Sequence, residues 1–168
     1  MAHAVRTRAA LLLALPAILA LTLLPGPGAS GAAKQAAFTV VAGQGGANGG
    51  LNFNGTSKGK LIITVPLGAA VQITLTNKGD LPHSLQIIPY TATPPSTAAA
   101  KPAFPGAETP NPQTGVNKGQ SAVAKFTASK PGKYLFICGF PGHALLGMYG
   151  VFEVSSSAST APSMTTAK

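Results

Sequence analysis

Short segments in which apolar and polar residues alternate fill the chain between residues 37 and 154. The clearest segment is 71–76, where Val71, Ile73 and Leu75 share one face and the polar residues between them share the other. A period of two residues is that of a strand with one buried face. No stretch in this region keeps the 3.6-residue period of an amphipathic helix. The pattern predicts seven or eight short strands, drawn from 37–42, 51–53, 60–66, 71–76, 84–89, 122–128, 133–138 and 149–154.

Turn-forming residues separate these segments and favour one architecture. Residues 43–50 contain five glycines and predict a flexible loop. Several short strands with turn signals between them are typical of a β-sandwich. The predicted fold class is therefore all-β, a two-sheet sandwich.

Two segments depart from the strand pattern. Residues 91–119 contain six prolines and many alanines, too irregular for a strand and too rich in proline for a long helix. We expect a long proline-rich connection over the surface of one end of the sandwich. Residues 155–168 are mostly serine, threonine and alanine, a composition that predicts a disordered tail.

The N-terminus has the features of an export signal. Arg6 and Arg8 precede an apolar run over 9–24, and small residues, glycine and proline follow over 25–33. The run is short for a membrane span, which needs about 20 residues. The predicted organisation is a signal peptide or membrane anchor over 1–33, one domain over 34–154 and the tail over 155–168.

Lysines and arginines outnumber acids by 12 to 3, and the formal net charge is +9. The basic residues after position 33 are lysines scattered along the chain, and together with an exported location this argues against nucleic-acid binding. The surplus serves solubility, or it attracts an acidic protein or an anionic membrane surface. A chain with so few carboxylates loses little when they are protonated, so we expect it to tolerate acid.

The chain contains a single cysteine, Cys138, at the end of an apolar segment. Exported proteins normally use cysteines in pairs, so a lone one is either a free thiol or occupied by a ligand. His143 and Met148 follow it at equal spacing in a loop rich in glycine, and His83 stands upstream in a turn. Taken singly, each of these residues has an ordinary structural explanation. Taken together, a thiolate, two imidazoles and a thioether are the ligand set of a blue-copper centre.

The softness of these ligands favours copper over zinc, which does not generally recruit methionine. The sequence therefore predicts one copper ion, cycling between Cu(II) and Cu(I), on His83, Cys138, His143 and Met148. Copper oxidases and nitrite reductases need further histidines, and no other histidine follows residue 33. This points to an electron carrier and not an enzyme.

Neighbours of the predicted ligands have two candidate roles. Phe136 and Phe140 are placed to exclude water from the sulfur, which favours Cu(I). Small and apolar residues surround His143, and they either form a surface where a redox partner approaches the imidazole or pack inward. The candidate docking residues are Pro141, Ala144, Leu145 and Leu146.

The ligand pattern, His83 followed by Cys138-x4-His143-x4-Met148, resembles that of the cupredoxins, with the loop length of the sulfocyanin and rusticyanin branch. The stretch 53–57, and the glycines, apolar residues and Thr76-Asn77 that follow, are similar to the sulfocyanin signature. This resemblance implies a Greek-key sandwich with one type 1 copper. It also implies that Ser84 hydrogen-bonds across to the Cys138 loop, whereas Asn77 is better placed to cap a turn near the site.

The resemblance further implies electron transfer outside the membrane, with a cytochrome, a cytochrome bc-type complex or a terminal oxidase as partner. The protein is then a monomer in the periplasm, on the outer face of the cytoplasmic membrane or secreted, and the segment over 9–24 is either cleaved or kept as an anchor. Two alternatives are a copper chaperone or storage protein and a metal-free adhesion sandwich. A chaperone would favour methionine-rich or paired-cysteine motifs, which this sequence lacks.

Overall fold

The computed structural model describes residue 1 and residues 34–168, and the predicted signal peptide or anchor over 1–33 falls almost wholly outside the described residues. Residues 34–168 lie within one compact unit. No helix formed by the described residues is long and apolar enough to cross a membrane.

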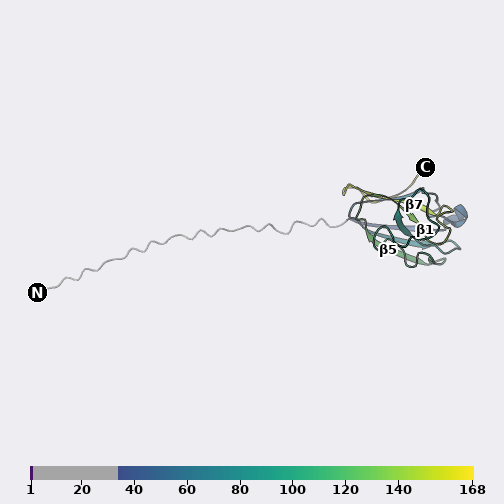
Figure 1. The fold of residues 1–168 in the computed structure, drawn as a ribbon, viewed down its shortest axis with the longest axis horizontal. Helices are drawn as coiled ribbons and strands as arrows, with labels where there is room; N and C mark the ends of the chain where they lie inside the picture. The colour runs from purple at the N-terminus through teal and green to yellow at the C-terminus, as the bar shows by residue number, and fades with distance from the viewer. Residues whose placement is uncertain (2–33) are drawn as a thin grey trace. The chain divides into compact units, whose positions relative to one another are not determined.

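Eight strands form two sheets in the described part of the chain, in agreement with the predicted sandwich (Figure 1). The first sheet has the order β1-β3-β5 and consists of β1 (Gln35–Ala42), β3 (Ala70–Asn77) and β5 (Ser121–Thr127). The second has the order β4-β6-β7-β2-β8. Its members are β4 (Gln86–Pro89), β6 (Gly132–Ile137), β7 (Tyr149–Ser155), β2 (Leu61–Pro66) and β8 (Ser163–Thr166).

The predicted alternation in β3 is confirmed, because Val71, Ile73 and Leu75 are buried and the residues between them are more exposed. These side chains belong to one core cluster with Ile63 of β2 and Phe152 of β7, so the core lies between the sheets. Burial of this apolar surface is the main force that holds the sandwich together.

The proline-rich connection over 91–119 differs from the prediction, because part of it is structural. Phe104 is buried and stacks on Phe126 of β5, with ring centroids 5.6 Å apart. The backbone of Ile87 in β4 accepts from Ala103 N and donates to the carbonyl of Ala107, each at 2.8 Å. The connection therefore satisfies the outer edge of β4, which would otherwise offer unpaired donors and acceptors.

The tail is not disordered throughout, so that prediction is wrong for residues 163–166. β8 pairs antiparallel with β2, and Leu61 lies opposite Thr166. All four β8 side chains are exposed, so the pairing rests on backbone hydrogen bonds and not on burial. Composition alone does not reveal this pairing, because the partner is an open strand edge about a hundred residues earlier.

Residues 43–53 also differ from the prediction. The segment Gln44–Gly50 forms two 3-10 turns separated by a kink, with left-handed dihedral angles at Gly45, Gly46, Asn48 and Gly49. Residues 51–53 form no strand, and Phe53 makes only isolated bridges to Ala42 and Thr56. The cause is a tight turn after Phe53, where Asn54 and Gly55 have φ values of 51° and 72°.

Candidate metal centre

Three of the predicted ligands lie where β6 ends and β7 begins. Cys138 directly follows β6, Met148 directly precedes β7, and His143 lies in the loop between them. Because β6 and β7 are antiparallel neighbours, the two ends of this loop meet, and Cys138 N donates to the Met148 carbonyl at 3.1 Å. His83 comes from the segment between β3 and β4, where its backbone pairs with Val116.

The structure brings the thiol and both imidazoles together inside the protein. Cys138 Sγ lies 3.5 Å from His143 Nδ1 and 3.9 Å from His83 Nδ1. The ligand atoms of the three residues all lie within 4.8 Å of one another. Cys138 and His83 are fully buried, and His143 keeps 6% of its surface exposed. Three ligand atoms at these distances are arranged to hold one metal ion.

Met148 is fully buried in the same core cluster as Cys138. Its backbone N donates to the His143 carbonyl at 2.9 Å, and its own carbonyl accepts from Cys138 N. Met148 is therefore tied through its backbone to both other ligands of its loop. Met148 is therefore the residue that would supply a thioether as the fourth ligand.

A second turn supports Met148 from outside the ligand loop, and the sequence reasoning missed it. Lys58 N donates to the Gly147 carbonyl at 2.7 Å, and Gly59 N donates to the Tyr149 carbonyl at 3.0 Å. The turn therefore holds the carbonyls on both sides of the ligand. Lys58 has a φ of 54°, unusual for a residue with a side chain. The Lys58-Gly59 pair was the available signal of a turn, but nothing in it indicates which strand it contacts.

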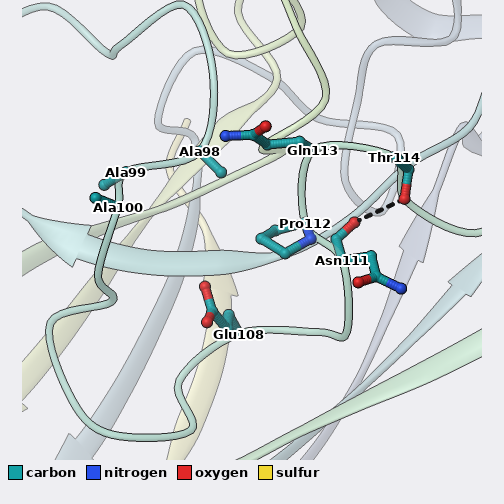
Figure 2. A pocket seen from close by; sticks show the side chains of 8 residues that line it. All are labelled: Ala98, Ala99, Ala100, Glu108, Asn111, Pro112, Gln113 and Thr114. Atoms are coloured by element: carbon teal, nitrogen blue, oxygen red, sulfur yellow. Dashed lines mark hydrogen bonds between the residues drawn. The ribbon is translucent and has the colours of Figure 1, made fainter.

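Ser84 connects three segments around the sulfur. Its backbone N donates to Cys138 Sγ at 3.4 Å, and its hydroxyl accepts from Gly139 N at 2.8 Å and donates to the Pro112 carbonyl at 2.6 Å. Figure 2 shows Pro112 in the wall of a cavity of about 500 Å³, with Asn111 and other residues of the proline-rich connection. The connection thus helps to close the site.

Asn77 is fully buried, and its side chain is bonded to backbone groups on both sides of His83. Its side chain donates to the carbonyls of Leu81 and Val116 at 2.7 and 2.8 Å and accepts from Gly79 N at 2.8 Å. These bonds fix both segments that flank His83. Asn77 therefore positions a ligand by holding the turns on either side of it.

The two phenylalanines lie on different sides of the centre. Phe136 is fully buried and packs against Phe53, with ring centroids 5.3 Å apart. Phe140 is half-buried, and its ring lies 4.6 Å from that of His143. Phe136 thus fills the core beneath Cys138, and Phe140 covers the more exposed imidazole.

The apolar residues around His143 divide between surface and core. Pro141, Leu145 and Leu146 are exposed, the two leucines to 52% and 62%. The prediction of Ala144 as a docking residue is wrong, because it is fully buried in a cluster with Ile137. The loop turns at Ala144, so its small side chain faces the protein and the leucines after it face solvent.

Without metal, the centre favours uncharged side chains. Burial, together with the charge of His143, lowers the pKa of His83 to about 4. Burial also lowers the pKa of His143 and raises the pKa of the Cys138 thiol, against hydrogen bonds that favour the thiolate. The imidazoles are therefore ready to bind a metal at neutral pH, and the thiol must release its proton first.

The donor set selects the metal. A thiolate and a thioether suit Cu(I), and two imidazoles suit both Cu(I) and Cu(II). The buried Nε2 of His83 points away from the sulfur, which leaves Nδ1 as the coordinating atom. The fold and these residues define a cupredoxin, a blue-copper protein that binds one copper ion in a type 1 site formed by His83, Cys138, His143 and Met148.

Residues 30–166 match the sulfocyanin (SoxE) domain, and the chain belongs to this family. Sulfocyanin from Sulfolobus acidocaldarius is 37% identical over 117 residues, which cover 66% of this chain and 58% of that protein. The matched region thus spans little more than half of that relative. Auracyanin-B from Chloroflexus aurantiacus is 48% identical over 40 residues, covering 24% of this chain and 17% of that protein.

Solved structures support the fold. Reduced auracyanin from Roseiflexus castenholzii superposes with a TM-score of 0.54 at 26% identity, over 73% of this chain and 98% of that one. Rusticyanin from Thiobacillus ferrooxidans superposes with a TM-score of 0.54 at 24% identity, over 73% and 78%. The fold, the ligand set and the family match agree, and the chain is a cupredoxin of the sulfocyanin family.

Proposed function

We propose that this protein is exported and carries single electrons between respiratory redox proteins. The observation that carries the proposal is a buried ligand set with one imidazole edge, that of His143, beneath exposed apolar side chains. A chaperone or storage protein must hand its metal to a partner, and full burial of Cys138 and His83 opposes such a transfer.

Copper supplies the one-electron chemistry through its Cu(II) and Cu(I) states. The protein contributes a constant geometry, because Cys138 and Met148 are joined by a backbone hydrogen bond and Ser84 ties Cys138 and Gly139 to a third segment. Ligands held in this way move little when the charge of the metal changes. Phe136 and Phe140 exclude water, so little solvent has to reorganise.

The apolar surface over His143 is the proposed site of electron exchange. We define it by Pro141, Leu145 and Leu146. Exposed apolar groups of this kind mark interaction surfaces, and this one lies next to the ligand with the greatest exposure. A partner seated on it reaches copper through a single imidazole.

The partner we propose is a cytochrome, a cytochrome bc-type complex or a terminal oxidase, with acidic groups around its contact surface. The lysine surplus supports this choice, because opposite charge speeds association. The segment over 1–33 supports export to the periplasm or the outer face of the cytoplasmic membrane, with that segment either cleaved or retained as an anchor.

Leu146→Lys tests the docking surface. The rate of electron transfer from a reduced soluble cytochrome should fall by about tenfold or more, since a charge placed in an apolar contact must be desolvated. The visible spectrum should not change. Leu67→Lys is the control, because Leu67 is also an exposed leucine, at 36%, and its backbone binds Ser155 at the end of β7 far from Met148. Equal rates in the wild type and both variants would refute this surface as the docking site.

A further inference from the structure

His83 contains a buried polar atom that the metal site leaves unexplained. The residue is fully buried, and its Nδ1 faces Cys138 Sγ while its Nε2 has no hydrogen-bond partner among the described residues. Coordination through Nδ1 leaves the proton on Nε2, so this atom is a donor. An unpaired buried donor costs about 1–3 kcal/mol, and imidazoles that bind metals normally donate this proton to an acceptor.

No side chain separates Nε2 from the glycines beside it. A Cβ built on Gly79 would lie 3.1 Å from Nε2, and one built on Gly43 would lie 3.4 Å from it. The two glycine backbones touch, and Gly43 has a φ of 69°. Glycine at both positions therefore leaves the space next to Nε2 free of side chains.

These glycines line a cavity of about 510 Å³ that has His83 in its wall. The rest of the lining is largely the backbone of the glycine-rich segment after Gly43, with Lys78 and Asp80. None of the residues that surround His143 on the apolar surface belongs to this lining. The cavity therefore reaches His83 from a part of the surface that is separate from the apolar surface around His143.

The side-chain acceptor beside Gly79 is already in use. Asn77 Oδ1 accepts from Gly79 N at 2.8 Å, and the Asn77 amide group is taken by two carbonyls. A polar cavity of this size has room for water, which needs about 30 Å³ per molecule and two or more polar partners.

We propose that an ordered water molecule in the glycine-lined cavity accepts the Nε2 proton of His83. This water fixes the orientation of the ring and makes Nδ1 a better donor to copper. It also gives the glycine-rich segment 43–50 a role, because side chains at Gly43 or Gly79 would occupy the position of the water. The inference requires bound copper but not the proposed redox partners.

The test is nuclear magnetic resonance on the Cu(I) protein with ¹⁵N-labelled histidine. The His83 Nε2 proton should show a cross-peak to a long-lived water in the wild type and lose it in Gly79→Ala. Gly79 does not have a positive φ, so the alanine introduces no backbone strain of that kind. The midpoint potential should rise in this variant, since a less basic His83 stabilises Cu(II) less. A fivefold change in the relative affinity for Cu(II) and Cu(I) converts to ~40 mV at ~59 mV per tenfold.

Gly46→Ala is the control, because a Cβ there meets no atom within 4 Å. Its φ of 70° makes the alanine costly for stability, but the variant should keep both the cross-peak and the potential. A wild-type cross-peak to the Asn77 side chain in place of water would overturn the proposal. So would a potential that depends on phosphate at constant ionic strength and loses this dependence in Lys78→Ala, because the acceptor would then be an anion. If Gly79→Ala does not fold, the presence or absence of the water cross-peak in the wild-type spectrum decides between the proposal and its rejection.

Discussion

Met148 is held through its neighbours as well as through its own backbone. Its loop is bonded to Cys138 and His143, and the Lys58-Gly59 turn binds the carbonyls of the residues before and after it. The held backbone and the burial of the side chain limit how far the thioether can move, so the protein sets the strength of its contact with the metal. The axial ligand in turn sets how strongly Cu(II) is favoured.

Exchange of the Met148 side chain should therefore move the potential in opposite directions. Met148→Leu removes the axial donor, destabilises Cu(II) and should raise the midpoint potential. Met148→Gln supplies an oxygen donor, which Cu(II) prefers, and should lower it. Each shift is expected to be on the order of a tenfold change in relative affinity, ~59 mV, measured by redox titration of the visible band. Equal potentials in all three proteins would show that Met148 is not the axial ligand.

At the scale of elements, the ligand loop depends on a turn with backbone strain. Lys58 occupies the left-handed region, which costs a residue with a side chain roughly 1–2 kcal/mol. Glycine adopts this conformation freely but loses more entropy on folding. Strain retained beside a functional ligand fits a turn whose position matters more than its stability.

Lys58→Gly should relieve this strain and raise the free energy of unfolding by up to ~1 kcal/mol, since the relief exceeds the added entropy cost. Urea denaturation of the copper-loaded protein measures the change. Lys60→Gly is the matched control, because Lys60 is another exposed lysine next to β2 that does not have a positive φ. The control should lose about 0.5–1 kcal/mol. A loss of stability in Lys58→Gly as large as in the control would contradict the interpretation.

The sequence was most informative where one residue type allows few roles. A single cysteine, two histidines and a spaced methionine identified the copper site, and alternation identified β3. Contacts between distant segments left no such signal. The pairing of β8 with β2, the insertion of Phe104 and the support of Met148 by Lys58 all join backbones whose composition is ordinary. Ala144 shows the same limit, since its orientation depends on how the loop turns.

At the scale of the whole molecule, carboxylates contribute little to stability. The described residues form one ion pair, between Lys118 and Asp80, and both side chains are well exposed. Lys118 lowers the pKa of Asp80, but an exposed pair of this kind is worth little. Protonation of acids therefore explains little of the response to pH, and the buried histidines of the metal-free protein take on that role.

The metal-free protein should lose stability as the pH falls from about 6.5 to about 4. The pKa of His83 is about 4 in the folded state and returns to its ordinary value near 6.5 on unfolding. Between these values the unfolded chain binds a proton that the folded chain does not, so acid favours unfolding. The pKa of His143 is also lowered and acts in the same direction. For His83 the loss is on the order of 3 kcal/mol, complete near pH 4.

Urea denaturation of metal-free protein at pH 7, 5.5 and 4 measures this profile. His83→Phe removes one of the two titrating groups and should reduce the loss to the part that His143 contributes, whereas Asp80→Asn removes only the exposed ion pair and should leave the profile unchanged. A wild-type profile that stays flat from pH 6.5 to 4 would mean that the imidazoles gain protons without unfolding. The expectation of acid tolerance from the scarcity of carboxylates would then extend to the metal-free protein. If the profile falls as expected, that tolerance applies to the carboxylates alone, and the empty centre is the part of the domain most sensitive to acid.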